Sequence, residues 1–193
     1  MTAVDERMIE VFDEHPELFG HYKIELLRGN IVMMAGPDWV HNLIVLSVQD
    51  QIPGGRWHRV QTQDVAIPGE SSEPQPDLVV VEKGAFKGPG RLVPAPAVTL
   101  AVEVVSKSSV EADYVTKRSM YAAGQIPAYL IIDPFEARCL LLTEPKGKGE
   151  EADYDVELKT KFGAPLALDV LGGFELNTSE FGTLPKVKRP RLP

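Results

Sequence analysis

Two short apolar runs that each carry one carboxylate constrain this chain more than any other feature. The run 99–106 (Thr-Leu-Ala-Val-Glu-Val-Val-Ser) is rich in β-branched residues and predicts a buried strand, yet Glu103 lies inside it. The run 77–82 begins with Asp77 and continues Leu-Val-Val-Val-Glu. A buried carboxylate needs a proton, a cationic partner or a metal, because an unpaired buried charge is costly. The chain must therefore fold so that something compensates Glu103.

The remaining patterns predict the helices and strands around these two runs. An Arg-Gly-Asn turn between two apolar segments predicts a β-hairpin over 22–34. Pro37 can occupy the first turn of a following helix, whose apolar residues recur at helical spacing up to Pro53. Further expected elements are an acidic helix at 3–19, strands at 60–67, 129–133, 138–143 and 154–161, and a long loop at 83–97. This order predicts an α/β (α+β) fold with a mixed β-sheet flanked by at least two helices.

The segment that follows Glu103 predicts a helix over 109–123. Ser108 and Glu111 have the spacing of a capping box at its start, and Gly124 followed by Pro127 is typical of a helix end. This helix directly follows the strand that carries Glu103. Its polar residues are therefore candidates for the partner that Glu103 requires.

Asp113, Lys117 and Tyr121 recur at helical spacing, so they share one face of this predicted helix. One interpretation is a solvent-exposed ion pair between Asp113 and Lys117, which contributes little to stability. The other is that Lys117 reaches over the sheet edge toward the carboxylates. A lysine there could orient or activate a water and stabilise charge on a phosphate. The spacing alone leaves both interpretations open.

Asp77 and Glu103 are candidate ligands of a divalent metal. Two adjacent strands that each present a carboxylate at a sheet edge form a hard-oxygen site suited to Mg²⁺ or Mn²⁺. Alternatively, Asp77 caps a turn after Pro76 and Glu103 pairs with a nearby lysine or arginine. We expect Asp77, Glu103 and the ammonium of Lys117 to lie in one pocket at the sheet edge.

Composition limits the class of protein. The 193 residues suit one domain, predicted over 1–184, followed by a basic and flexible C-terminal tail at 185–193. A net charge of −8 argues against a broadly basic surface that would bind nucleic-acid phosphates. The single Cys139 excludes an internal disulfide, and no apolar run is long enough for a membrane helix. We therefore expect a cytoplasmic protein that does not interact with a membrane.

Several short motifs occur together in an order that resembles a known family. They are Glu25-Leu-Leu-Arg-Gly-Asn, His41, Pro76-Asp77, Glu103-Val-Val-Ser, Lys117-Arg-Ser-Met-Tyr121 and Leu171-Gly-Gly-Phe-Glu-Leu. Over residues 20–181 the chain resembles the PD-(D/E)XK nuclease superfamily and, more narrowly, the Uma-two family of putative restriction endonucleases. The resemblance implies a restriction-endonuclease-like mixed sheet flanked by helices, with an N-terminal hairpin.

The resemblance also implies roles for single residues. Asp77 and Glu103 would be metal ligands and Lys117 the catalytic lysine. The superfamily pattern places a lysine two residues after the glutamate, where this chain has Val105. In the family this lysine moves to the following helix, and Lys117 occupies the matching place. Tyr121 would support it.

Two weaker candidates come from the N-terminal part. Glu25 would be a further carboxylate ligand from the hairpin, although a cross-strand salt bridge on an exposed face explains it equally well. His41 matches the family, but a lone histidine on an amphipathic helix is more often structural than catalytic, and it lacks metal-ligand spacing.

Together these features imply a metal-dependent endonuclease that hydrolyses phosphodiester bonds of DNA with Mg²⁺ or Mn²⁺. We expect a homodimer, because cutting two strands requires two sites. Val105 and the acidic charge favour an alternative, a catalytically silent member of this fold that binds nucleic acid or a protein partner. A third possibility is an unrelated acidic ligand-binding domain.

Overall fold

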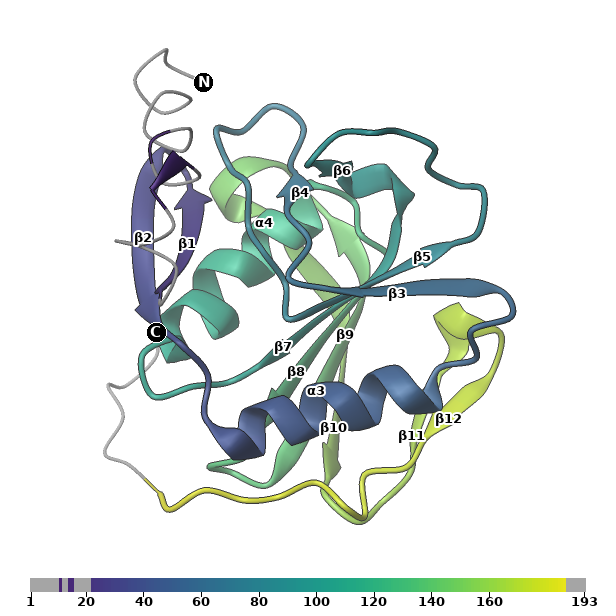
Figure 1. Ribbon diagram of the computed structural model, residues 1–193. Coiled ribbons are helices and arrows are strands. Elements are labelled where there is room, and N and C mark those ends of the chain that lie inside the picture. Colours follow the sequence, from purple (N-terminus) through teal and green to yellow (C-terminus); the bar gives the residue numbers. More distant parts are fainter. Residues whose placement is uncertain (1–10, 12–13, 16–21, 187–193) are drawn as a thin grey trace.

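A six-stranded mixed sheet forms the centre of the computed structural model (Figure 1). Its strands, in spatial order, are β10 (Asp153–Lys161), β9 (Arg138–Lys146), β8 (Ala128–Asp133), β7 (Val98–Val104), β5 (Leu78–Glu82) and β3 (Trp57–Gln61). Only the β7–β8 pair is parallel among the neighbours of this sheet. The structure describes residues 11, 14, 15 and 22–186, so most of the predicted acidic helix and of the predicted tail lie outside the described residues.

The predicted hairpin is confirmed. Strands β1 (Tyr22–Leu27) and β2 (Asn30–Ala35) pair antiparallel, with Gly29 at φ 76° in the turn. They form a separate two-stranded sheet, and a single bridge from Leu26 to Glu73 links it to the segment before β5. Figure 1 shows this hairpin standing beside the helical segment that contains α4.

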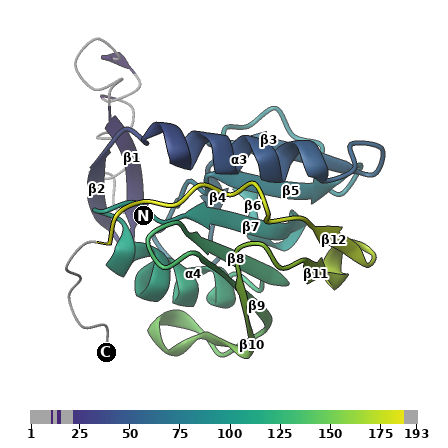
Figure 2. The ribbon, with the colours of Figure 1, turned by 90° about the horizontal axis from the view of Figure 1, so that it is seen from below.

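Two helical segments cover opposite faces of the central sheet (Figure 2). Helix α3 (Trp39–Gln51) covers one face. The π-helix η2 (Ala112–Thr116) continues into α4 (Lys117–Ala123) on the other. The prediction that Pro37 lies in the first turn of α3 is wrong, because Asp38 caps the helix by accepting a hydrogen bond from the His41 amide at 2.9 Å.

The segment before η2 is held by two serines rather than by the predicted capping box. The Ser106 amide donates to the Ser109 hydroxyl at 2.9 Å, and the Ser109 amide donates to the Ser106 hydroxyl at 3.2 Å. This reciprocal pair turns the chain directly after β7. The helical segment therefore returns over the strand that carries Glu103.

Short elements account for the other differences from the prediction. The expected strand 60–67 is divided, because β3 ends at Gln61 and the short β4 (Val65–Ala66) pairs with β6 (Val93–Pro94) in the predicted loop. Patterning did not predict β11 (Leu166–Leu168), β12 (Phe174–Leu176) or the 3₁₀ turns η1 (Ala95–Ala97), η3 (Gly149–Glu151) and η4 (Asp169–Leu171). Two or three residues are too few to show a period.

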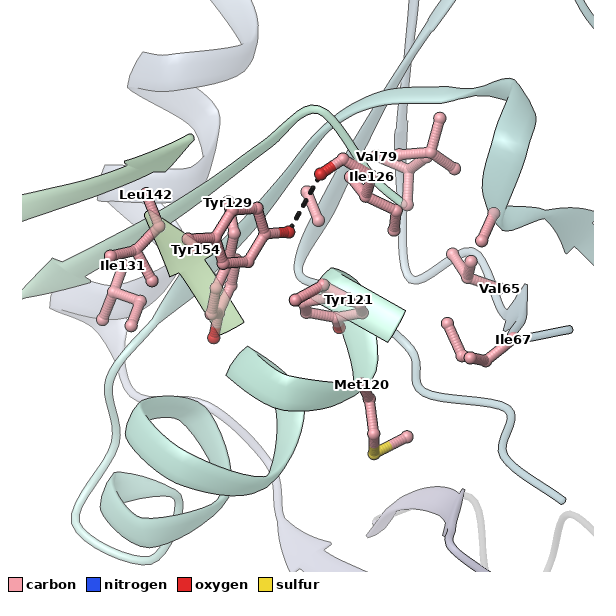
Figure 3. Packing of buried hydrophobic residues seen from close by; sticks show 14 of the residues in the cluster. Val65, Ile67, Val79, Met120, Tyr121, Ile126, Tyr129, Ile131, Leu142 and Tyr154 are labelled. Atoms are coloured by element: carbon pink, nitrogen blue, oxygen red, sulfur yellow. Dashed lines mark hydrogen bonds between the residues drawn. The ribbon is translucent and has the colours of Figure 1, made fainter. Parts of the chain in front are cut away.

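Side-chain alternation along the strands builds a separate core on each face. The core under α3 includes Leu78 and Val80 of β5, whereas their neighbours Val79 and Val81 belong to the core under α4. In the core under α4, the rings of Tyr121 and Tyr129 pack edge to face with their centroids 4.8 Å apart, and Figure 3 shows these buried side chains. Within the described residues, no helix is long and apolar enough to cross a membrane.

Candidate functional site

Strand register brings Asp77 and Glu103 together. Strands β5 and β7 are antiparallel with Leu78 opposite Val102, so continuing the register by one residue sets Asp77 beside Glu103. Alternation places Glu103 on the same face as Ala101 and Val105, which pack in the core under α4. The α4 segment therefore covers the face from which Glu103 projects.

Glu103 is buried, with 2% of its surface exposed, and its Oε1 atom is held by two donors. The ammonium of Lys117 donates to Oε1 at 2.7 Å, and the hydroxyl of Tyr121 donates to the same atom at 2.9 Å. Glu103 thus has the cationic partner that its burial requires. Tyr121 reaches this oxygen from the helical face that it shares with Lys117.

Asp77 is held in a similar way through one of its two oxygens. Its Oδ2 atom accepts hydrogen bonds from the backbone amide of Val104 at 2.8 Å and from Nε2 of His41 at 3.0 Å. Its other oxygen, Oδ1, accepts from the ammonium of Lys23 at 3.0 Å. His41 therefore lies in the site, where it orients Asp77.

Glu25 of β1 belongs to the same cluster. Its Oε1 atom accepts from the Gln75 amide at 2.7 Å and lies 2.9 Å from the ammonium of Lys117. Only 1% of Glu25 is exposed, so the interpretation as a surface salt bridge is wrong. The hairpin adds a third buried carboxylate to those of Asp77 and Glu103.

Lys117 and Asp113 are both enclosed by protein. Their side chains are 0% and 1% exposed and lie 3.7 Å apart, so the interpretation as a solvent-exposed ion pair is wrong. Asp113 also accepts a hydrogen bond from the Ser109 hydroxyl. The wider turn of the π-helix lies where Asp113 faces the cluster, and π-helices often occur at functional sites.

Burial and paired charge shift the pKa values of these groups in opposite directions. Burial raises the pKa of Glu103 to about 8, although Lys117 and Lys23 oppose the rise. Burial likewise raises the pKa of Asp113 to about 6, against the charge of Lys117. For Asp77, Lys23 and His41 outweigh burial and hold the pKa below its ordinary value. The site thus holds neighbouring carboxylates whose pKa values are driven apart, an arrangement common at functional sites.

The two lysines remain charged. Burial opposes the charge of Lys117, but Glu103 and Glu25 outweigh it and raise its pKa above the ordinary value. The pKa of Lys23 is also raised well above its ordinary value, since Asp77 and Glu103 outweigh the effect of burial. Two ammonium groups therefore face four buried carboxylates, those of Glu25, Asp77, Glu103 and Asp113.

A pocket of about 270 Å³ opens onto this cluster. Its wall includes Asp77, Glu103 and Lys117, so the expectation that these three residues share one pocket is confirmed. His41 and Lys23 also line it, whereas Glu25 and Tyr121 are buried behind the wall.

The donor chemistry of the cluster fits a hard divalent cation, although its oxygens are spaced around an ammonium group rather than at metal-ligand distances. Carboxylate oxygens are the ligands that Mg²⁺ prefers, at about 2.1 Å. Within the described part of the chain, however, no three His, Cys, Asp or Glu side chains are arranged to hold a metal ion. The Lys23 ammonium lies between Asp77 and Glu103 instead. The Oε2 atom of Glu25 is buried without a hydrogen-bond partner, as is Oδ1 of Asp113.

Lys23 was not predicted from the sequence, and Asp113 was predicted only as the partner of Lys117. A signal for Lys23 was present, because Lys23 and Glu25 are two residues apart on one strand and must share a face. Asp113 and Lys117 gave a helical spacing that fits an exposed pair and a buried pair equally well.

Comparisons with known proteins agree with this architecture. No curated protein matches the chain. A crystal structure of a "putative nuclease belonging to DUF820" from Anabaena variabilis ATCC 29413 is similar with a TM-score of 0.64 and 12% identity, covering 82% of this chain and 88% of that one. That likeness shows a shared fold. The family model Uma2, described as "Putative restriction endonuclease", matches residues 9–179. The chain therefore belongs to the Uma2 family of putative restriction endonucleases.

Proposed function

We propose that this protein is a metal-dependent endonuclease that hydrolyses phosphodiester bonds of DNA. The observation that carries the proposal is that the two oxygens of each central carboxylate have different partners. Asp77 and Glu103 each have one oxygen fixed by two protein donors, while the other oxygen faces the Lys23 ammonium. Metal ligands are typically fixed by outer hydrogen bonds in this way.

Asp77 and Glu103 would hold a Mg²⁺ or Mn²⁺ ion, with Glu25 as a further ligand. When bound, the ion would act as a Lewis acid on the phosphate and lower the pKa of a bound water. His41 and the amide of Val104 orient Asp77. Tyr121 orients Glu103.

Charge explains why such a site would require a metal. The four carboxylates exceed the two ammonium groups that contact them, so the cluster alone would repel a phosphodiester when fully ionised. A divalent ion between the carboxylates and the phosphate removes this repulsion. The same requirement suits a chain whose net charge of −8 gives little general attraction for DNA.

The superfamily pattern places its lysine where this chain has Val105, and we assign the role of that lysine to Lys117. The side chain of Val105 is buried in the core under α4 and has no polar atom to offer. Lys117 instead contacts both Glu25 and Glu103 from the helical segment and borders the pocket. We assign it the stabilisation of charge at the site.

Cleavage of plasmid DNA tests the proposal. The wild type should cut with Mg²⁺ or Mn²⁺ and not with a chelator. Asp77→Asn and Glu103→Gln should each lower the rate by about 100-fold or more, since losing a ligand costs more than losing its outer partner. Asp155→Asn and Glu175→Gln change exposed residues of the same types and should leave the rate unchanged.

Melting curves separate loss of metal binding from loss of folding. Mg²⁺ should raise the melting temperature of the wild type and of both exposed controls, but not of the Asp77 and Glu103 variants. Absence of cleavage under all conditions would contradict the proposal. If DNA binding persisted in that case, the catalytically silent alternative would be supported.

We also propose that the protein acts as a homodimer, because two sites are required to cut both strands and twofold dimers are the commonest oligomers. Light scattering across a wide range of concentrations tests this. A monomer throughout would contradict it.

A further inference from the structure

The position of Lys23 carries an inference about how the site takes up its metal, and it rests on the metal dependence proposed above. The Lys23 ammonium lies 3.0 Å from Oδ1 of Asp77, 3.5 Å from Oε2 of Glu103 and 4.0 Å from Oε1 of Glu25. A single cationic group therefore meets the three carboxylates that we assign as ligands.

Among the described residues, Oδ1 of Asp77 and Oε2 of Glu103 have no protein donor other than Lys23, whereas Oε1 of Glu25 also accepts from the Gln75 amide and lies 2.9 Å from Lys117. Donors from His41, Val104, Lys117 and Tyr121 occupy the other oxygen of Asp77 or of Glu103. The carboxylates are thus already oriented, with Oδ1 of Asp77 and Oε2 of Glu103 converging on one point. That point is occupied by the Lys23 nitrogen.

The two lysines of the site differ in their freedom to move. Lys117 is 0% exposed and is enclosed by Glu25, Glu103 and Asp113. The Lys23 side chain is 17% exposed and lines the pocket. A flexible four-carbon chain at the pocket wall can swing its ammonium into solvent, whereas the buried lysine cannot.

We propose that Lys23 occupies the divalent-cation position when no metal is bound, and that Lys23 and the metal exclude each other there. The ammonium sets oxygen distances of 3.0 and 3.5 Å, whereas Mg²⁺ needs about 2.1 Å. The carboxylates must close in by about 1 Å when the ion replaces the lysine. Replacing one positive charge by two also reduces the excess of negative charge in the cluster. Lys23 therefore keeps the acids paired and sets the metal concentration at which the site fills.

Binding of Mn²⁺, measured by titration calorimetry, tests this exclusion. Lys23→Met removes the competing charge and should bind Mn²⁺ about tenfold more tightly than the wild type, a change typical of residues around a metal. Lys23→Arg keeps the charge and should bind no more tightly than the wild type. Lys83→Met removes an exposed lysine far from the cluster and should match the wild type. Equal or weaker binding by Lys23→Met would overturn the inference.

Amine labelling of the wild type gives a second measurement that needs no variant to fold. Saturating Mn²⁺ should increase the labelling of Lys23, located by peptide mass spectrometry, and leave buried Lys117 protected. Unchanged labelling of Lys23 would overturn the exclusion even if Lys23→Met were unstable.

The outcomes also distinguish this inference from the proposed function. Metal-dependent cleavage without tighter Mn²⁺ binding by Lys23→Met would contradict the inference about Lys23 and support the proposed nuclease function. Tighter Mn²⁺ binding by Lys23→Met without any DNA cleavage would support the inference about Lys23 and contradict the proposed nuclease function. If neither protein binds Mn²⁺ at millimolar concentrations, both are wrong.

Discussion

The two faces of strand β7 are stabilised by different interactions. Toward α3 the strand presents only apolar side chains, which are Leu100, Val102 and Val104. Toward α4 it presents Ala101 and Glu103, and Val105 packs in the same core directly after the strand ends. The first face is stabilised by burial and packing, which tolerate changes that keep volume and polarity. The second depends on the pairing of each charge, so single changes there act through electrostatics.

The largest expected effect comes from removing the buried cation on the α4 side. Lys117→Met leaves Glu25 and Glu103 without their shared partner and should lower the free energy of unfolding by about 3–5 kcal/mol. Urea denaturation measures it. The double variant Lys117→Met/Glu103→Gln should recover part of the loss, because one unpaired charge is removed as well. A single variant as stable as the wild type would show that the faces do not differ in this way.

A core truncation on the α3 side should be costly for a different reason. Leu130 of β8 is fully buried in the core on the α3 side, and Leu130→Ala should lower the free energy of unfolding by about 2–5 kcal/mol through lost burial and a cavity. Leu158→Ala, which truncates a leucine that is 46% exposed, should cost less than about 0.5 kcal/mol. Because no charge is involved, the loss for Leu130→Ala should be the same at about pH 5 and about pH 9. A loss for Leu130→Ala that varied with pH would show that the α3 side also depends on charge.

The pH dependence of stability should come from the α4 side. The change in the free energy of unfolding per pH unit should be smaller than the losses caused by the two substitutions above. The folded protein raises the pKa of Glu103 from 4.5 to about 8. Its contribution to stability is therefore complete below the unfolded value and is lost as the pH rises toward about 8. One proton changes the free energy of unfolding by at most about 1.4 kcal/mol per pH unit. Without metal, the urea midpoint of the wild type should fall across this range.

Glu103→Gln is the control for this titration, because glutamine resembles the protonated acid and cannot ionise. Its urea midpoint should fall less steeply over the same range, with a remaining slope from Asp113, whose pKa is raised to about 6. Asp77 acts in the opposite sense, since its lowered pKa adds stability that is lost only as the pH falls below its ordinary value. Equal slopes for the wild type and Glu103→Gln would contradict the assignment.

The strands and the main candidates could be predicted because their signals are local. The apolar runs of β5, β7 and β8 identify buried strands, and Glu103 inside such a run demands a partner whatever surrounds it. Lys117 and Tyr121 share a helical face, and both reach Glu103. Element boundaries were less certain, as the capping by Asp38 and the division of 60–67 show, because they depend on single hydrogen bonds.

The sequence by itself determined that Glu103 needed a partner, because it lies within an otherwise apolar run that predicts a buried strand. Only the tertiary structure decided which groups meet Glu103. The register of β5 on β7 sets Asp77 beside Glu103, and the hairpin brings Glu25 and Lys23 from far along the chain. Periodicity specifies the face on which a side chain lies but not the segment that packs against that face. The pairing of Lys23 with Asp77 and Glu103 is therefore a property of the fold.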